Sequence, residues 1–171
     1  MIEVYVLFGQ FKKKTFWGWL VNVLTGSRIN HVALVVREKG RENYEHLFAL
    51  HSDIKRKSKW IPLNTLLKIV EPVDVLYFAD VIPHSLFFND LNNFNMNPYK
   101  MTKYFLTRIF FKQYPPDACT VPVISWLNYY RKHEAYNIAK NYSPVSLWKT
   151  LVTNCVSSKS VMEEWKCKSL L

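Results

Sequence analysis

Cys119 has the most informative surroundings of any residue that could do chemistry. Pro122 follows three positions later, and proline is tolerated in the first turn of a helix but not in its interior. If a helix runs on through Trp126, Pro122 places its start near Ala118 or Cys119. Unpaired N–H groups and the positive end of the helix dipole favour a thiolate at that position, and they could bind an oxyanion during acyl transfer. The alternative is a buried structural cysteine, which is common in apolar helices.

His31 is the candidate general base for such a thiol. It stands at the head of a β-branched run at residues 29–36, which predicts a central strand. A side chain at the end of a sheet can be held rigidly, which suits a base. The alternative is a histidine that only completes the core or the sheet edge.

A third polar residue could orient His31 and fix its tautomer. His46 and His51 lie on the strand that follows, but their positions differ by an odd number, so they face opposite sides and at most one can serve. We prefer His46 and keep His51 as the alternate. His84 and His133 fall in a loop and at a helix end, which indicates surface residues.

The elements that must position these residues follow one another in an α+β pattern, not as alternating βαβ units. We expect a central antiparallel sheet packed against the helix that carries the nucleophile. A charged segment with Gly40 in its middle predicts a hairpin turn at residues 37–43. The strands are predicted at residues 3–8, 29–36, 44–51 and 73–78, and the helices at 15–24, 99–111, 119–131 and 145–152, the last of them started by Ser143-Pro144.

Length and charge bound the remaining possibilities. The 171 residues fit a single domain covering 1–171, and about half of them are apolar, which is enough for a core. The formal charge of +10 favours an anionic surface as partner, or belongs to a protein that is simply basic. The basic run at residues 55–59 beside Trp60 raises nucleic acid as a third hypothesis, but we do not prefer it because a charge run is usually a solvated face.

The cysteines and the apolar runs indicate a reduced, cytoplasmic protein. Cys119, Cys155 and Cys167 have no disulfide-framework spacing, although the last two could pair if the chain were secreted, and no ligand pattern predicts a metal or a cofactor. No signal peptide opens the chain, and the apolar stretch at residues 16–24 is too short to span a bilayer. Its two tryptophans beside three lysines could lie against a membrane or a partner, but we prefer an amphipathic core helix.

Three segments together resemble one known group of enzymes. Residues 25–35 (TGSRINHVALV) are similar to a segment ending in a Ser-His-Val-type strand, and residues 117–124 (DACTVPVI) to a Cys-Ser-Glu-Phe-Val-type helix start. Residues 142–148 (YSPVSLW) resemble a Thr-Pro-x-x-Leu segment of phage members. In this order, with histidine before cysteine, the chain resembles the circularly permuted NlpC/P60 group of papain-like thiol enzymes, in the phage and bacterial amidase-like branch related to lecithin:retinol acyltransferase.

The resemblance implies a papain-like permuted fold and a cysteine hydrolase, either a peptidase or amidase or a thioesterase-like enzyme or acyltransferase. It would act through an acyl-enzyme on Cys119 with His31 as base, on peptide, peptidoglycan or lipid acyl bonds. Cys119 is followed by Thr-Val-Pro where the group has Ser-Glu. The alternative hypothesis is therefore a binding or structural protein, such as a phage accessory or virion protein, that keeps the fold with weak chemistry or none.

Overall fold

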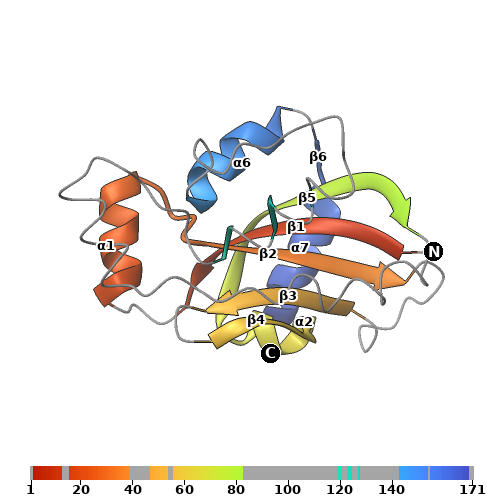
Figure 1. Ribbon diagram of the computed structural model, residues 1–171, viewed down its shortest axis with the longest axis horizontal. Helices are drawn as coiled ribbons and strands as arrows, with labels where there is room; N and C mark the ends of the chain where they lie inside the picture. The colour runs from red at the N-terminus through yellow and green to blue at the C-terminus, as the bar shows by residue number, and fades with distance from the viewer. Residues whose placement is uncertain are drawn as a thin grey trace.

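The computed structural model describes residues 2–12, 16–38, 47–53, 56–82, 119–120, 123–124, 127, 143–153 and 155–169. These residues form a mixed α+β structure around a six-stranded sheet with the strand order β4-β3-β2-β1-β5-β6 (Figure 1). Every pair of neighbouring strands is antiparallel. The α+β class and the antiparallel sheet are as the sequence predicts.

The centre of the sheet is β1 (Ile2–Phe11), between β2 (His31–Glu38) and β5 (Val70–Ile82). β1 and β5 contain the strands predicted from their apolar runs, and β5 extends beyond its prediction at both ends. β2 begins at His31, two residues later than predicted, and ends two residues later. Because layers cover both faces of the sheet, apolar residues occupy consecutive positions in the central strands. The β1–β2 register places Phe8 opposite Val32, so their side chains lie on the same face.

The outer strands differ most from the prediction. The described part of β3 is Leu47–Asp53, and Arg37, the first residue of the predicted hairpin turn, is still paired with Leu47 in the β2–β3 ladder. Residues 39–46 lie outside the described part of the chain. β4 (Arg56–Pro62) covers most of the basic run that we interpreted as a solvated face, and β6 (Val156–Ser157) adds a short strand at the other edge. Lysines are common on edge strands because they discourage pairing with another chain.

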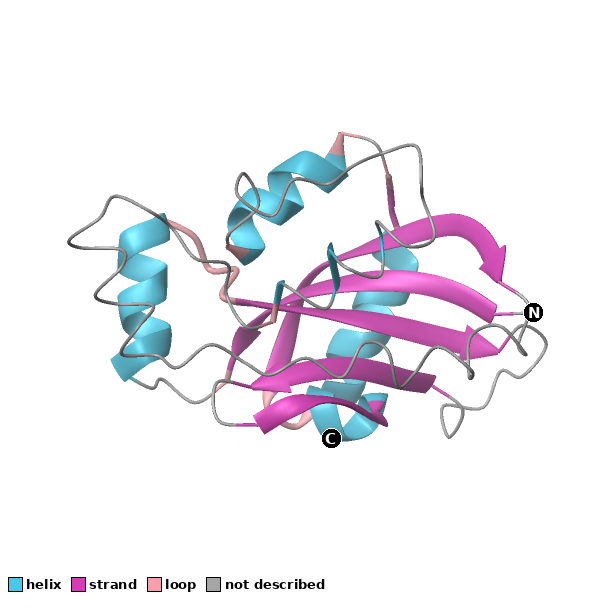
Figure 2. Cartoon of the chain, in the orientation of Figure 1, coloured by secondary structure: helices cyan, strands magenta, loops and turns pink. Residues whose placement is uncertain are grey.

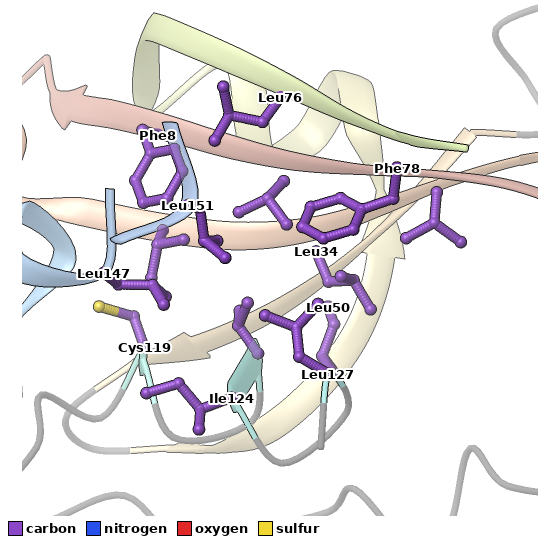
Figure 3. Packing of buried hydrophobic residues seen from close by; sticks show 14 of the residues in the cluster. Phe8, Leu34, Leu50, Leu76, Phe78, Cys119, Ile124, Leu127, Leu147 and Leu151 are labelled. Atoms are coloured by element: carbon purple, nitrogen blue, oxygen red, sulfur yellow. The ribbon is translucent and has the colours of Figure 1, made fainter. Parts of the chain in front are cut away.

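One face of the sheet packs against α6 and the segment that starts at Cys119, as Figure 3 shows. Alternate residues of the central strands, among them Phe8, Val32 and Leu34, are buried there without exposure to solvent. The described residues of the segment, Cys119, Thr120, Val123, Ile124 and Leu127, are all buried. These side chains form one core cluster, which we call the first core cluster, and through it the segment predicted to carry the nucleophile packs onto the sheet.

Helix α6 (Pro144–Val152) begins where Ser143-Pro144 predicts. The Ser143 hydroxyl accepts a hydrogen bond from the Ser146 amide at 3.2 Å, and the Ser146 hydroxyl accepts one from the Ser143 amide at 3.0 Å. This reciprocal capping satisfies N–H groups that the helix itself leaves open. Trp148 Nε1 donates to Asp74 Oδ2 at 2.7 Å, which fastens the helix to β5.

The opposite face is covered by α2 (Leu63–Leu67) and α7 (Lys159–Ser169), which Figure 2 shows behind the sheet. Trp165 of α7 is 2% exposed and is the largest buried side chain of this second core cluster. Its ring packs edge-on against Tyr5 of β1, with centroids 5.7 Å apart. The sheet is thus the middle of three layers.

Helix α1 (Phe16–Thr25) lies beyond the end of the sheet where β2 begins (Figure 1). It matches the helix predicted at residues 15–24, and it stops at Gly26, whose φ of 61° is left-handed. Glycine adopts that conformation without the steric cost that a side chain brings. The turn leads directly into the residues before His31.

Candidate active site

His31 opens β2 and is buried there, with 1% of its surface exposed. The β1–β2 ladder pairs it with Gly9, so its backbone is fixed by the central strand of the sheet. Its imidazole packs against the ring of Phe11, with the centroids 4.8 Å apart. The prediction that His31 heads a strand is therefore confirmed.

The residue that contacts this imidazole is His51, the alternate of our prediction. His51 Nδ1 lies 3.1 Å from His31 Nε2, and His51 is itself 7% exposed. The β2–β3 register explains the contact, since Leu34 pairs with Leu50 and the next step along the ladder brings His51 beside Ala33, diagonal to His31 on the same face. The preferred third residue, His46, lies outside the described part of the chain, as do His84 and His133.

Burial sets the charge of His31. It lowers the pKa of His31 well below the usual 6.5, and the neighbouring His51 lowers it further because two imidazolium ions would repel each other. Within the described residues, His31 contacts the imidazole of His51 and the aromatic ring of Phe11. His31 is consequently neutral at physiological pH and able to accept a proton.

A single hydrogen atom lies between His31 Nε2 and His51 Nδ1, and the tautomers of the two rings decide which nitrogen donates it. If His31 Nε2–H donates to His51 Nδ1, then His31 Nδ1 keeps its lone pair and can act as a base. If His51 Nδ1–H donates, then neutral His31 carries its proton on Nδ1 and offers no base there. An orienting partner that accepts from one nitrogen and leaves the other basic is what general base catalysis requires.

Asn30 holds the chain in place just before His31, and the sequence reasoning did not identify it. Its Oδ1 accepts a hydrogen bond from the Phe11 amide at 3.0 Å, and its Nδ2 donates to Asn22 Oδ1 of α1 at 3.1 Å. Its own amide donates to the Gly9 carbonyl at 3.0 Å. A polar residue directly before an apolar strand was the signal that could have found this anchor.

Cys119 is 8% exposed and belongs to the first core cluster. Its backbone forms a turn and helical conformation begins at Thr120, which agrees with the helix start inferred from Pro122. The cluster also contains Ile29 and Val32, which lie beside His31 in the chain, and Figure 3 shows Cys119 beside Leu147 of α6. The thiol thus lies at the beginning of a helical segment and among apolar side chains.

The two layers of the core determine how Cys119 and His31 can meet. Val32 faces the cluster that contains Cys119, whereas strand alternation directs His31 to the face of Ala33. The contact of His31 with Phe11, which packs on the second cluster, agrees with that direction. Ile29 has the same parity as His31 but belongs to the first cluster, so the strand alternation of side chains does not extend to the residues before His31. Any reaction of the thiol with the imidazole must therefore take place around this end of the sheet.

Comparison of the chain with family models, curated proteins and solved structures finds no match. Arguments about its function therefore start from the residues themselves. Among the described helices, none has the length and apolar character needed to cross a membrane. Within the same part of the chain, no group of three or more potential metal ligands is gathered.

Proposed function

We propose that this protein is a cysteine hydrolase of the circularly permuted NlpC/P60 type, with Cys119 as nucleophile, His31 as base and His51 as the residue that orients the base. The observation that carries the proposal is the buried contact of 3.1 Å between His31 and His51 at the start of β2. The segment that begins at Cys119 belongs to the core cluster that also contains Ile29 and Val32, on the two sides of His31 in the chain. His31 precedes Cys119 along the chain, as histidine precedes cysteine in the permuted group.

In this mechanism His31 Nδ1 accepts the thiol proton, while His31 Nε2–H donates to His51 Nδ1. Sγ attacks an acyl carbon, and backbone N–H groups at the start of the helical segment hold the oxyanion. His31 returns the proton to the leaving amine or alcohol, and an acyl-thioester remains on Cys119. A water molecule, deprotonated by His31, then releases the acid and regenerates the thiol. The bonds cleaved are amide or ester bonds of peptide, peptidoglycan or lipid acyl substrates.

Burial makes a lone imidazolium at His31 costly. A thiolate at Cys119 would supply the missing counter-charge, so the two ions would form together as a pair. The proposal therefore requires that the pKa of the Cys119 thiol depend on His31. A thiol that only fills the core would show no such dependence.

The test is the pH dependence of iodoacetamide alkylation, read for each cysteine by mass spectrometry of the same sample. Cys167 is exposed, and its alkylation in the same sample serves as the internal reference. We expect the alkylation midpoint of Cys119 at least about one pH unit below that of Cys167, and a return toward the reference in His31→Gln. Equal midpoints for the two cysteines in the unmodified protein would contradict the proposal.

The second candidate is a binding or structural protein that keeps this fold without the chemistry. It is favoured by the apolar surroundings of Cys119 and by the alternation that directs His31 to the other face. In that case Cys119 reacts as a buried thiol, more slowly than Cys167 and with a midpoint no lower than that of Cys167, because apolar surroundings raise the pKa of a thiol. The same alkylation experiment therefore separates the two functions.

A further inference from the structure

Helix α1 presents apolar side chains to solvent. Trp19, Val23 and Leu24 are 56%, 58% and 57% exposed, which makes α1 the element with the most large exposed hydrophobic residues in the described chain. With about 100° of rotation per residue, Val23 and Leu24 lie about 40° and 140° from Trp19 around the helix axis. The three therefore occupy one side of α1, which we call the outer face.

The other side of α1 is attached to the protein. Asn22 lies about 60° from Trp19 in the opposite direction around the axis, and its Oδ1 accepts the hydrogen bond from Asn30 Nδ2 at 3.1 Å. After the turn at Gly26, the Ile29 amide donates to Ser27 Oγ at 3.1 Å. The helix stands beyond the end of the sheet (Figure 2), and the Asn22–Asn30 hydrogen bond joins it to the residues before β2.

The charge around α1 has one sign. From residue 4 to residue 36 the chain contains no Asp or Glu, whereas Lys12, Lys13, Lys14 and Arg28 fall within this range. Lys12 and Arg28, on the two sides of α1 in the chain, are both exposed. An apolar helix face with exposed basic residues flanking the helix in the sequence combines the two attractions that hold interfacial helices on anionic lipid.

We propose that the outer face of α1 docks on an anionic phospholipid surface. The flanking basic residues disfavour a second copy of this chain as the occupant, because two such surfaces would bring positive charges together. Exposed tryptophan and aliphatic side chains gain free energy by entering the boundary between headgroups and acyl chains, which a nucleic acid does not offer. The docking is independent of Cys119 and of the proposed chemistry.

The test is co-sedimentation of the full chain with vesicles of phosphatidylcholine alone and of phosphatidylcholine mixed equally with phosphatidylglycerol. We expect binding to the mixed vesicles and little to phosphatidylcholine alone. The double variant Lys12→Ala/Arg28→Ala should bind the mixed vesicles about 25-fold more weakly, at about fivefold for each charge removed. The matched control is Lys149→Ala/Lys159→Ala, which removes two exposed charges from α6 and α7 and should bind nearly as the unmodified protein does.

The apolar contribution is tested with Val23→Ser/Leu24→Ser, for which we expect about tenfold weaker binding. Val152→Ser/Val156→Ser changes exposed side chains elsewhere and is the control. Equal losses in the α1 variants and their controls, or equal binding to both kinds of vesicle, would overturn the proposal. So would a dimer in solution that Val23→Ser/Leu24→Ser abolishes. Cys119→Ser should bind vesicles unchanged, which keeps this test separate from that of the hydrolase.

Discussion

Acidification should destabilise this protein through the histidine pair. In the folded state burial and His51 lower the pKa of His31 well below the usual 6.5, whereas the unfolded chain has the usual value. Below pH 6.5 the unfolded state therefore binds a proton that the folded state does not. The contribution of neutral His31 to stability is fully present above that pH and is lost as the pH falls toward the pKa of folded His31.

The size of the effect follows from the proton linkage. Each pH unit between 6.5 and the pKa of folded His31 costs about 1.4 kcal/mol of unfolding free energy, so a change from about pH 7.5 to about pH 5 removes up to about 2 kcal/mol. That is a large part of the 5–15 kcal/mol typical of a domain. It is also distinct from the titration of ordinary carboxyl groups, which takes place mostly below pH 5.

The assay is urea unfolding of the unmodified protein and of His31→Gln across this pH range. Glutamine can hydrogen-bond to His51 but cannot titrate, so the unmodified protein should lose up to about 2 kcal/mol more than the variant. Parallel losses in the two proteins would refute the argument. If His31→Gln does not fold, the titration of the imidazole by NMR decides the matter, and an imidazolium signal from His31 at pH 6 would refute a lowered pKa.

Two further predictions concern the packing that holds the site. Asp74→Ala leaves Trp148 Nε1 without its acceptor and should lower the unfolding free energy by about 1–3 kcal/mol, measured by urea unfolding. Gly9→Ala places a Cβ 2.3 Å from Val70 Cγ1 and should cost about 1–3 kcal/mol or prevent folding, whereas Gly26→Ala meets no atom within 4 Å and should cost only the strain of its positive φ, about 1–2 kcal/mol. A milder effect at Gly9 than at Gly26, in thermal unfolding of both variants, would contradict this description of the two positions.

The central strands could be predicted from sequence because their patterns are local. The β-branched run of β2 and the alternation in β1 identify strands whatever lies beside them. The basic strand β4 could not be predicted in this way, because its lysines and arginine resemble a solvated segment until the partner strand is known. A strand at the edge of a sheet depends on pairing for its stability more than on its own apolar residues.

The candidate site was likewise predictable from local sequence patterns only in part. That His31 heads a strand follows from local pattern, and Pro122 restricts where a helix can start. The choice between His46 and His51 depends on the register of β2 with β3, which is set by a turn whose length the sequence does not reveal. The ladder places His51 beside Ala33, and with it the imidazole contact of His31.

The pH dependence of stability reports the pKa of His31, and the alkylation experiment reports the pKa of the Cys119 thiol. A buried imidazole without a counter-charge resists protonation, so a lowered pKa of His31 alone indicates only that the pair is enclosed. A thiolate brought around the start of β2 would make the imidazolium favourable, and by reciprocity the imidazolium would lower the pKa of the thiol by the same free energy. An enclosed pair beside a thiol of ordinary pKa is a structural pair, because coupling of the two charges is what a thiol hydrolase needs and packing alone does not provide it.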